Sequence, residues 1–196
     1  MSQVHDTQPE PAADPDLFLD FANTVELTNG VPEDAVPDGR SLRTWLRDRS
    51  LIGGRTSAAA VDRELGEFQR LRDLLRAAAA RVADGRGPSR AQVRVLNDIL
   101  RDGVHHHELH ATADGRYEFQ PVGDALAQAR SAIAGSLAHY LADHDVQRLR
   151  VCANDGCRWL FVDRSPAGRR RWCDMRTCGN RAKVARHRAR QASLSS

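Results

Sequence analysis

Aromatic side chains are scarce in this 196-residue chain, at 5% of all residues. Its core must therefore rest on leucine, alanine and valine, which favours packed helices over a β-sandwich or barrel. No apolar run reaches the ~18 residues of a membrane span, so none is predicted. Residues 1–15 have neither a positive leader nor an apolar stretch, and they are rich in proline. We predict a disordered tail there, with no secretory signal and no membrane partner.

Several enzyme motifs are also missing. The chain has no glycine-rich phosphate loop, no nucleophile elbow and no HExxH pair. We also find no internal repeat, no coiled-coil heptad array and no low-complexity tract. The sequence therefore predicts a cytoplasmic protein that is not an enzyme. An enzymatic role for the N-terminal body stays open as an alternative.

Acidic residues are rare at one end of the chain. Between Arg148 and Arg190 there are 13 Lys/Arg and only 3 Asp/Glu, a local charge of +10. Since the whole chain carries +3, the remainder carries −7. The small net charge of the whole chain is therefore the sum of an acidic body and a strongly basic C-terminal segment. Such a basic segment favours an acidic partner.

Apolar residues in the body recur at helical spacing. The clearest pattern begins after Ser57, and Ser89 with Gln92 forms a capping-box signature for the next helix. Asp114-Gly115, between weakly alternating residues, predicts a β-hairpin. We predict a mainly α-helical body over residues 16–147 with one β-hairpin. Its expected helices cover residues 16–27, 41–49, 57–83, a stretch from 89, and 124–142, with a loop at 28–40.

The four cysteines fall within 27 residues, as Cys152-x4-Cys157-x15-Cys173-x4-Cys178. Two close pairs at this separation suit four-thiolate zinc, and a chain without a secretory signal favours metal over disulfides. Disulfides, buried thiols or a mixed site with His187 remain alternatives. We predict one structural zinc per chain in a treble-clef-like finger over residues 148–190, followed by a tail at 191–196. Its hairpin would pair strand 158–162 with a return strand at 170–172, before a helix at 181–190.

These residues resemble a known family. The run RWLFVDRS, the RRWC before the third ligand and Cys178-Gly179-Asn180-Arg181 are similar to the CGNR zinc finger. Upstream, FLDFANTVEL, the Leu42–Trp45–Leu46 helix, LRDLLRA and VLNDIL resemble the ABATE domain. The resemblance covers nearly everything after residue 15. It implies a bacterial, stress-induced transcription regulator, and it implies no particular ligand or operator.

Charge geometry gives an independent reason to expect DNA binding. Arginine dominates over lysine, which suits bidentate contacts with phosphate or guanine, and no RNP-type aromatic pattern points to RNA. An alanine stripe (Ala182, Ala185, Ala189) would pack the last helix on the two tight turns that carry the cysteine pairs, which we call the first knuckle (residues 152–157) and the second knuckle (residues 173–178). We predict that double-stranded DNA, in the nucleoid, is contacted by Arg169, Arg170, Arg171, Arg181, Lys183, Arg186, Arg188 and Arg190. A homodimer is expected because one finger spans few base pairs.

Alternatives stay open for both parts. The finger could dock on an acidic protein as an adaptor, or be a structural clip with a solvated tail. The body could sense a small-molecule effector through Asn23, Thr24, Glu26 and Asn97, or bind a substrate with the finger as a DNA tether. His105, His106 and His107, near Glu108 and His110, could hold a second metal or sense pH, and a solvated hairpin edge is the plainer interpretation.

Overall fold

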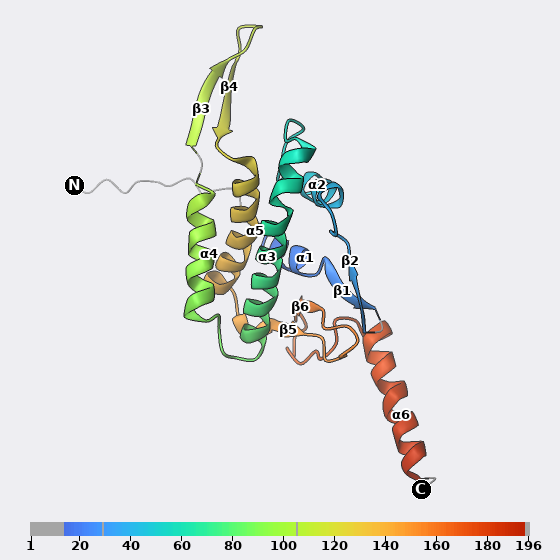
Figure 1. Cartoon of the computed structure of the whole chain (residues 1–196). Coiled ribbons are helices and arrows are strands. Elements are labelled where there is room, and N and C mark those ends of the chain that lie inside the picture. Colours follow the sequence, from blue (N-terminus) through green and yellow to red (C-terminus); the bar gives the residue numbers. More distant parts are fainter. Residues whose placement is uncertain (1–13, 29, 105, 195–196) are drawn as a thin grey trace, which may run out of the picture.

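The computed structural model describes residues 14–28, 30–104 and 106–194 (Figure 1). A helical body is followed by a small irregular segment and a terminal helix that stands away from it. The elements are α1 Leu17–Ala22, β1 Val25–Thr28, β2 Val31–Asp34, α2 Gly39–Asp48, α3 Ala58–Ala83, α4 Arg90–Asp102, β3 His106–Ala111, β4 Tyr117–Val122, α5 Ala125–Asp143, the 3₁₀ turn η1 Val146–Arg148, β5 Leu149–Val151, β6 Leu160–Val162, the π-helical turn η2 Met175–Gly179 and α6 Asn180–Leu194.

Side-chain caps set the starts of the long helices close to the expected positions. Ser57 accepts from the amide of Ala60 at 3.2 Å and starts α3. At α4, Ser89 accepts from the amide of Gln92 at 3.2 Å, and the Gln92 side chain accepts from the Ser89 amide at 2.7 Å. This reciprocal capping box satisfies two amides that the first turn leaves without partners. The mainly α-helical class is confirmed.

The core of the body forms around α1, which packs against both α3 and α5. Phe18 and Phe21 are fully buried, and the Phe21 ring meets the Phe68 ring edge-on at 6.1 Å. Leucines of α3 and α5 complete this core. Phe18 also contacts Tyr140, and Phe21 contacts Trp45, so five of the ten aromatic residues gather around this short helix.

The prediction of a helix over residues 16–27 is wrong beyond Ala22. The hydroxyl of Thr24 donates to the carbonyl of Phe21 at 2.8 Å, and this local bond competes with helix continuation. The chain then forms β1, which pairs antiparallel with β2, so the segment predicted as a loop at 28–40 contains a strand. The described body therefore holds two hairpins, this one and the predicted β3–β4 hairpin.

Two stretches named from the sequence lie outside the described residues: the tail at 1–13 and residues 195–196. His105 also lies outside them, and so do the side chains of His106 and His107, so the histidine hypothesis stays a prediction. Among the helices that are described, none is long and apolar enough to cross a membrane.

Candidate metal centre and basic surface

Four thiols converge where the two knuckles meet. The sulfur atoms of Cys152, Cys157, Cys173 and Cys178 all lie within 4.8 Å of one another. The Cys157 and Cys173 Sγ atoms are 3.7 Å apart, and those of Cys173 and Cys178 are 3.8 Å apart. A tetrahedron with Zn–S bonds of ~2.3 Å has edges of ~3.8 Å. The four cysteines are therefore positioned to bind one zinc ion, and they form a closed, structural shell.

Asn154 orders the first knuckle from inside. Its side-chain oxygen accepts from the Gly156 amide at 3.1 Å, and its carbonyl accepts from the Cys157 amide at 2.8 Å. Its side-chain NH2 points to the Cys178 Sγ at 3.4 Å, in the second knuckle. A turn role for Asn154 follows from the sequence, whereas its contact with Cys178 was not predicted, although its position between two ligands was a signal for it. Such outer contacts orient metal ligands and stabilise their charge.

Without metal, crowding makes these thiols hard to ionise together. Burial raises the pKa of Cys157 to about 11, and burial also raises the pKa of Cys173 well above its ordinary range. For Cys178 burial acts the same way, but the Asn154 side chain and the neighbouring cysteines outweigh it and lower the pKa. Zinc binding must displace the thiol protons, and the cation then compensates the thiolate charge that burial penalises.

The hairpin of the finger differs from the predicted one. Strand β6 pairs with β5, which precedes the first cysteine, and residues 170–172 form no strand. Only the carbonyl of Arg171 joins the first knuckle, accepting from the Ala153 amide at 2.8 Å. Asp163 holds the connecting loop instead: its carboxylate accepts from the Ser165 hydroxyl at 2.6 Å and from the Arg170 amide at 2.8 Å. The Ser165 hydrogen bond is the main cause that lowers the pKa of Asp163 to about 2.

The body holds the finger through its core and through Asn23. Leu149 and Leu160, on β5 and β6, are buried in the same core as α1 and α3. The Asn23 side chain donates to the Leu160 carbonyl at 2.8 Å and accepts from the Leu160 amide at 3.0 Å. The Gly30 amide also donates to the Gly156 carbonyl in the first knuckle, at 3.2 Å. The finger is therefore packed onto the body along one side.

The predicted DNA-binding residues divide into groups. Arg170 is structural, because its guanidinium lies 5.2 Å from the Phe161 ring centre and donates to the Cys173 carbonyl. Arg186 and Arg188 belong to α6, but their side chains lie outside the described ones. Arg176, on η2, is exposed and was not predicted. The other predicted cations are exposed: Arg169, Arg171, Arg181, Lys183 and Arg190.

Arg171 and Arg181 line one groove at the base of α6. The groove has a volume of about 430 Å3 and lies between the first knuckle and the helix. Ala182 and Ala185 line its helix side, so this part of the alanine stripe faces an open groove, not the tight knuckle contact that we predicted. Trp172 lines the groove as well, and the Arg171 guanidinium lies 5.2 Å from its ring centre.

Comparison with known families agrees with this geometry. The ABATE family model, described as "Putative stress-induced transcription regulator", matches residues 15–144, and the CGNR zinc finger model matches residues 148–191. The chain belongs to the ABATE family. The resemblance read from the sequence is confirmed in both parts and in their order. A search of the curated proteins found no match.

The candidate ligand residues of the ABATE body are not gathered in one cavity. Asn23 and Thr24 are buried and engaged: Asn23 bonds Leu160, while the Thr24 hydroxyl contacts Phe21 and Arg72. Asn97 is exposed on α4. Glu26 is exposed on β1, where it lines a cleft of about 380 Å3 beside the zinc ligands. A ligand site built from all four therefore does not form.

A larger cavity lies where the ABATE body meets the CGNR finger. It has a volume of about 620 Å3 and is lined by Tyr140 and His144 of the body and by Arg164 and Ser165 of the finger. The His144 ring stacks on Tyr140 with centroids 5.3 Å apart. Arg164 holds Asp16 with two bonds of 2.6 and 2.7 Å across this junction. The sequence did not predict this cavity, because its walls come from segments far apart in the chain.

Proposed function

We propose that this ABATE protein is a bacterial transcription regulator that binds double-stranded DNA through its CGNR finger and α6. One observation carries the proposal. Exposed Arg171 and Arg181, together with one acidic residue, Asp155, line a groove at the base of a helix that stands away from the body (Figure 1), and the sequence has no Asp or Glu after Asp174. The family description supports the regulatory role.

The dimensions of α6 suit the major groove. Its 15 residues extend over ~22 Å, and a helix ~10–12 Å across fits a groove ~12 Å wide. Lys183 and Arg190 are exposed and seven residues apart, so they lie along one side of the helix. Arg181, two residues before Lys183, lies on the opposite side of α6, where the groove is, so we expect it and Arg171 to contact phosphates at the edge of the major groove.

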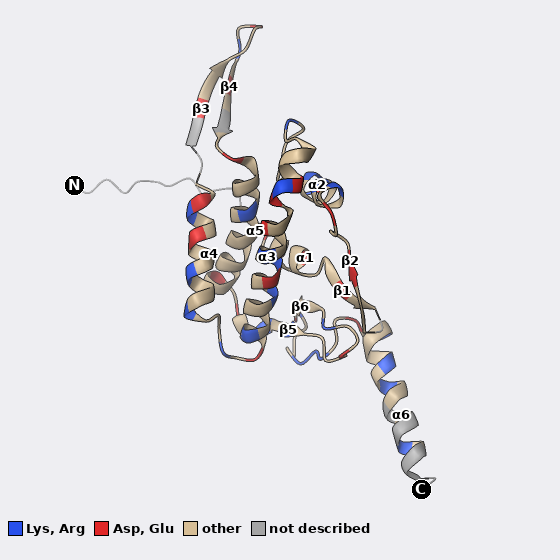
Figure 2. Ribbon diagram, in the orientation of Figure 1, with Lys and Arg blue, Asp and Glu red and all other residues tan. Residues whose placement is uncertain are grey.

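The acidic body favours an approach through α6. Figure 2 shows acidic residues spread over the body, whereas the described part of α6 carries basic residues and no acidic ones. DNA that contacts α6 avoids the body over residues 16–147, whose 16 Arg and 20 Asp/Glu give a net charge of −4 that would repel phosphates. The direction in which α6 leaves the body therefore helps to keep bound DNA away from the acidic residues.

Zinc has a structural role in this proposal. Four thiolates fill its coordination shell, so no position stays open for a substrate, and the proposal contains no catalytic step.

The proposed regulator is a homodimer in the cytoplasm, because a single finger contacts few base pairs. Effector sensing stays a prediction, and the junction cavity beside His144 fits it better than the four residues chosen from the sequence.

Reversing two charges at the groove should remove DNA binding. The variant Arg171→Glu with Arg181→Glu is expected to bind a mixed-sequence duplex about 100-fold more weakly at low salt. Each arginine contact is worth roughly 1–3 kcal/mol, and about 1.4 kcal/mol is a factor of ten. Fluorescence anisotropy of a labelled duplex measures the change, and each preparation should still hold one zinc per chain.

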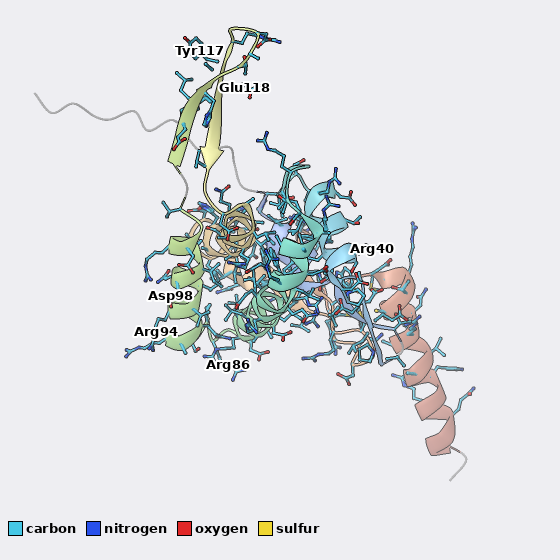
Figure 3. All side chains as sticks on the ribbon, turned by 45° about the horizontal axis from the view of Figure 1, so that its top comes forward. Arg40, Arg86, Arg94, Asp98, Tyr117 and Glu118 are labelled. Atoms are coloured by element: carbon cyan, nitrogen blue, oxygen red, sulfur yellow. The ribbon has the colours of Figure 1, made fainter. Side chains whose placement is uncertain are left out.

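The matched control reverses Arg40 and Arg94, two exposed arginines of the body labelled in Figure 3. Arg40→Glu with Arg94→Glu changes the net charge by the same amount and should leave affinity within a factor of a few. Equal losses in both variants would mean that only net charge matters. A groove variant that binds like the wild type would favour the adaptor alternative, with an acidic protein as partner.

A further inference from the structure

The four zinc ligands are not equally shielded from solvent. Cys152 is fully buried and Cys178 is 4% exposed, whereas Cys157 and Cys173 are only partly buried. The cleft of about 380 Å3 that opens beside the metal centre is lined by both of these partly buried cysteines. Cys157 and Cys173 are therefore the ligands that a small molecule can reach.

This cleft lies between the body and the finger. Its body wall is formed by β1, with Glu26 and Thr28, and its finger wall includes Trp159 and Thr177. Figure 1 shows the β1–β2 hairpin reaching the start of α6, beside the second knuckle. The volume is at the lower end of the range for small-molecule sites. The cleft therefore admits a small reagent to the sulfur atoms.

Charge favours a neutral reagent in this cleft. Two carboxylates, those of Glu26 and Asp174, and one guanidinium, that of Arg181, line the described part of it. Four thiolates around one Zn2+ add a net charge of about −2. The cleft thus has an excess of negative charge, which repels anionic oxidants and leaves access to a neutral one such as hydrogen peroxide.

Hydrogen bonds make Cys173 the strongest nucleophile among the ligands that line the cleft. The Cys178 sulfur accepts from the Asn154 side chain at 3.4 Å, and the Cys157 sulfur has a hydrogen bond with the backbone of Trp159. The contacts described for the Cys173 sulfur are with the sulfurs of Cys157 and Cys178, at 3.7 and 3.8 Å. A hydrogen bond stabilises a thiolate and weakens its attack on an electrophile. Metal ligation keeps Cys173 as a thiolate, the form that reacts.

We infer that Cys173 and Cys157 are a peroxide-reactive pair, which hydrogen peroxide converts to a disulfide with release of the metal. The Cys173 thiolate attacks one peroxide oxygen, so that an S–O bond forms, the O–O bond breaks and hydroxide leaves. The Cys157 thiolate then attacks the sulfur of this sulfenic acid, so that an S–S bond forms and a second hydroxide leaves. Two thiolates lose two electrons in all, and one peroxide becomes two hydroxide ions.

Cys157, and not Cys178, is the second thiolate of the reaction. Both sulfurs lie at nearly the same distance from the Cys173 sulfur. Cys178 is buried within the π-helical turn η2 and its sulfur is held by Asn154, whereas Cys157 is partly exposed at the end of the first knuckle. Burial and the Asn154 hydrogen bond both oppose the movement that Cys178 would need to form the S–S bond.

The disulfide removes two of the four ligands at once. Since a finger of this size has too little core to fold without its metal, we expect oxidation to disorder the groove that holds Arg171 and Arg181. Peroxide would then switch DNA binding off. This consequence rests on the proposed function, whereas disulfide formation and zinc release do not.

Non-reducing peptide mapping of the full, zinc-loaded chain tests the inference, with released zinc followed by a coloured chelator in the same samples. A tenfold excess of hydrogen peroxide should release one zinc per chain, and the first disulfide should join Cys157 to Cys173. Cys152 and Cys157 share one tryptic peptide, VCANDGCR, so fragmentation of the linked peptides must locate the bridge. Dithiothreitol with added zinc should restore the metal content.

Asn154→Ala removes the hydrogen bond that holds Cys178. In its zinc-loaded form, the ratio of Cys173–Cys178 to Cys157–Cys173 disulfide should rise about fivefold, the factor that corresponds to a hydrogen bond of about 1 kcal/mol. Asn97→Ala, at an exposed position of α4, is the matched control and should keep the wild-type ratio.

The wild-type map decides the inference even if Asn154→Ala fails to hold zinc. A first disulfide that contains Cys152 or Cys178, or zinc that stays bound in the excess of peroxide, would overturn it. An unchanged ratio in zinc-loaded Asn154→Ala would contradict the selectivity assigned to Cys157. None of these readouts involves DNA, so a failure of the proposed function leaves the result interpretable.

Discussion

Replacing Cys152 by serine is expected to abolish stoichiometric zinc binding and to unfold the finger. Zinc contributes an apparent ~10–16 kcal/mol to the folding of small zinc-finger peptides, and a finger of this size has too little core to fold without it. The effect should reach the body, because Leu149 and Leu160 are part of its core and Asn23 bonds the backbone of Leu160. We expect a lower thermal midpoint for the whole chain and loss of ordered finger amides in hydrogen exchange.

Thr177→Ser is the matched control, since Thr177 is exposed in the second knuckle and its side chain is not a ligand. It should keep one zinc per chain and the wild-type midpoint. A chelator added to the wild type should reproduce the Cys152→Ser result. If Cys152→Ser kept one tightly bound zinc and unfolded like the wild type, the four-thiolate site would be wrong.

Asp34→Ala should destabilise the body by about 3 kcal/mol, near the lower end of the range for breaking a buried ion pair. The Arg72 side chain is only 6% exposed, and both its terminal nitrogens donate to Asp34 at 2.7 Å. Removing the carboxylate leaves a buried guanidinium with the Thr24 hydroxyl as its remaining partner among the described contacts. Urea unfolding at constant pH measures the loss. Arg72→Met added to Asp34→Ala should recover part of it.

The pH dependence of stability gives a second readout for this pair. Burial acts to raise the pKa of Asp34, but the Arg72 hydrogen bond, the Val36 amide hydrogen bond and the Arg72 charge together outweigh it, so the folded pKa lies below the ordinary 3.8. The stabilisation is therefore present above pH 3.8 and is lost as the pH falls through the folded pKa. Asp34→Ala should lack this part of the acid sensitivity. Glu67→Ala, which removes an exposed ion pair with Arg70 on α3, should leave the free energy of unfolding close to the wild-type value.

Local signals in the sequence predicted the parts of the fold that depend on neighbouring residues. Ser57 and the Ser89–Gln92 pair marked helix starts because a cap is a bond within three residues. Asp114-Gly115 marked the hairpin for the same reason, since Gly115 adopts the positive φ that the turn requires. The cysteine spacing also predicted the metal centre, because four ligands leave few other arrangements.

Non-local pairing explains the errors. Nothing near Asn23 indicates that its side chain bonds Leu160, 137 residues away. Likewise β6 pairs with β5, a segment before the first cysteine, because this register buries Leu149 and Leu160 in the body. Periodicity within the finger contains no information about that shared core. Arg170 packs against Phe161 for the same reason, so Arg170 is not one of the exposed cations.

The most direct test of the central claim is a salt titration of DNA binding by the wild-type chain, with zinc quantified in the same sample. Besides Arg158 and Arg164, which pair with Asp155 and Asp16, six described cations are exposed around the finger and α6: Arg169, Arg171, Arg176, Arg181, Lys183 and Arg190. If they neutralise about six phosphates, log K should fall with log salt at a slope near −5, about a thousandfold loss between 50 and 200 mM. With one zinc per chain, the account predicts this steep dependence. Absent or salt-independent binding by zinc-loaded protein would contradict it.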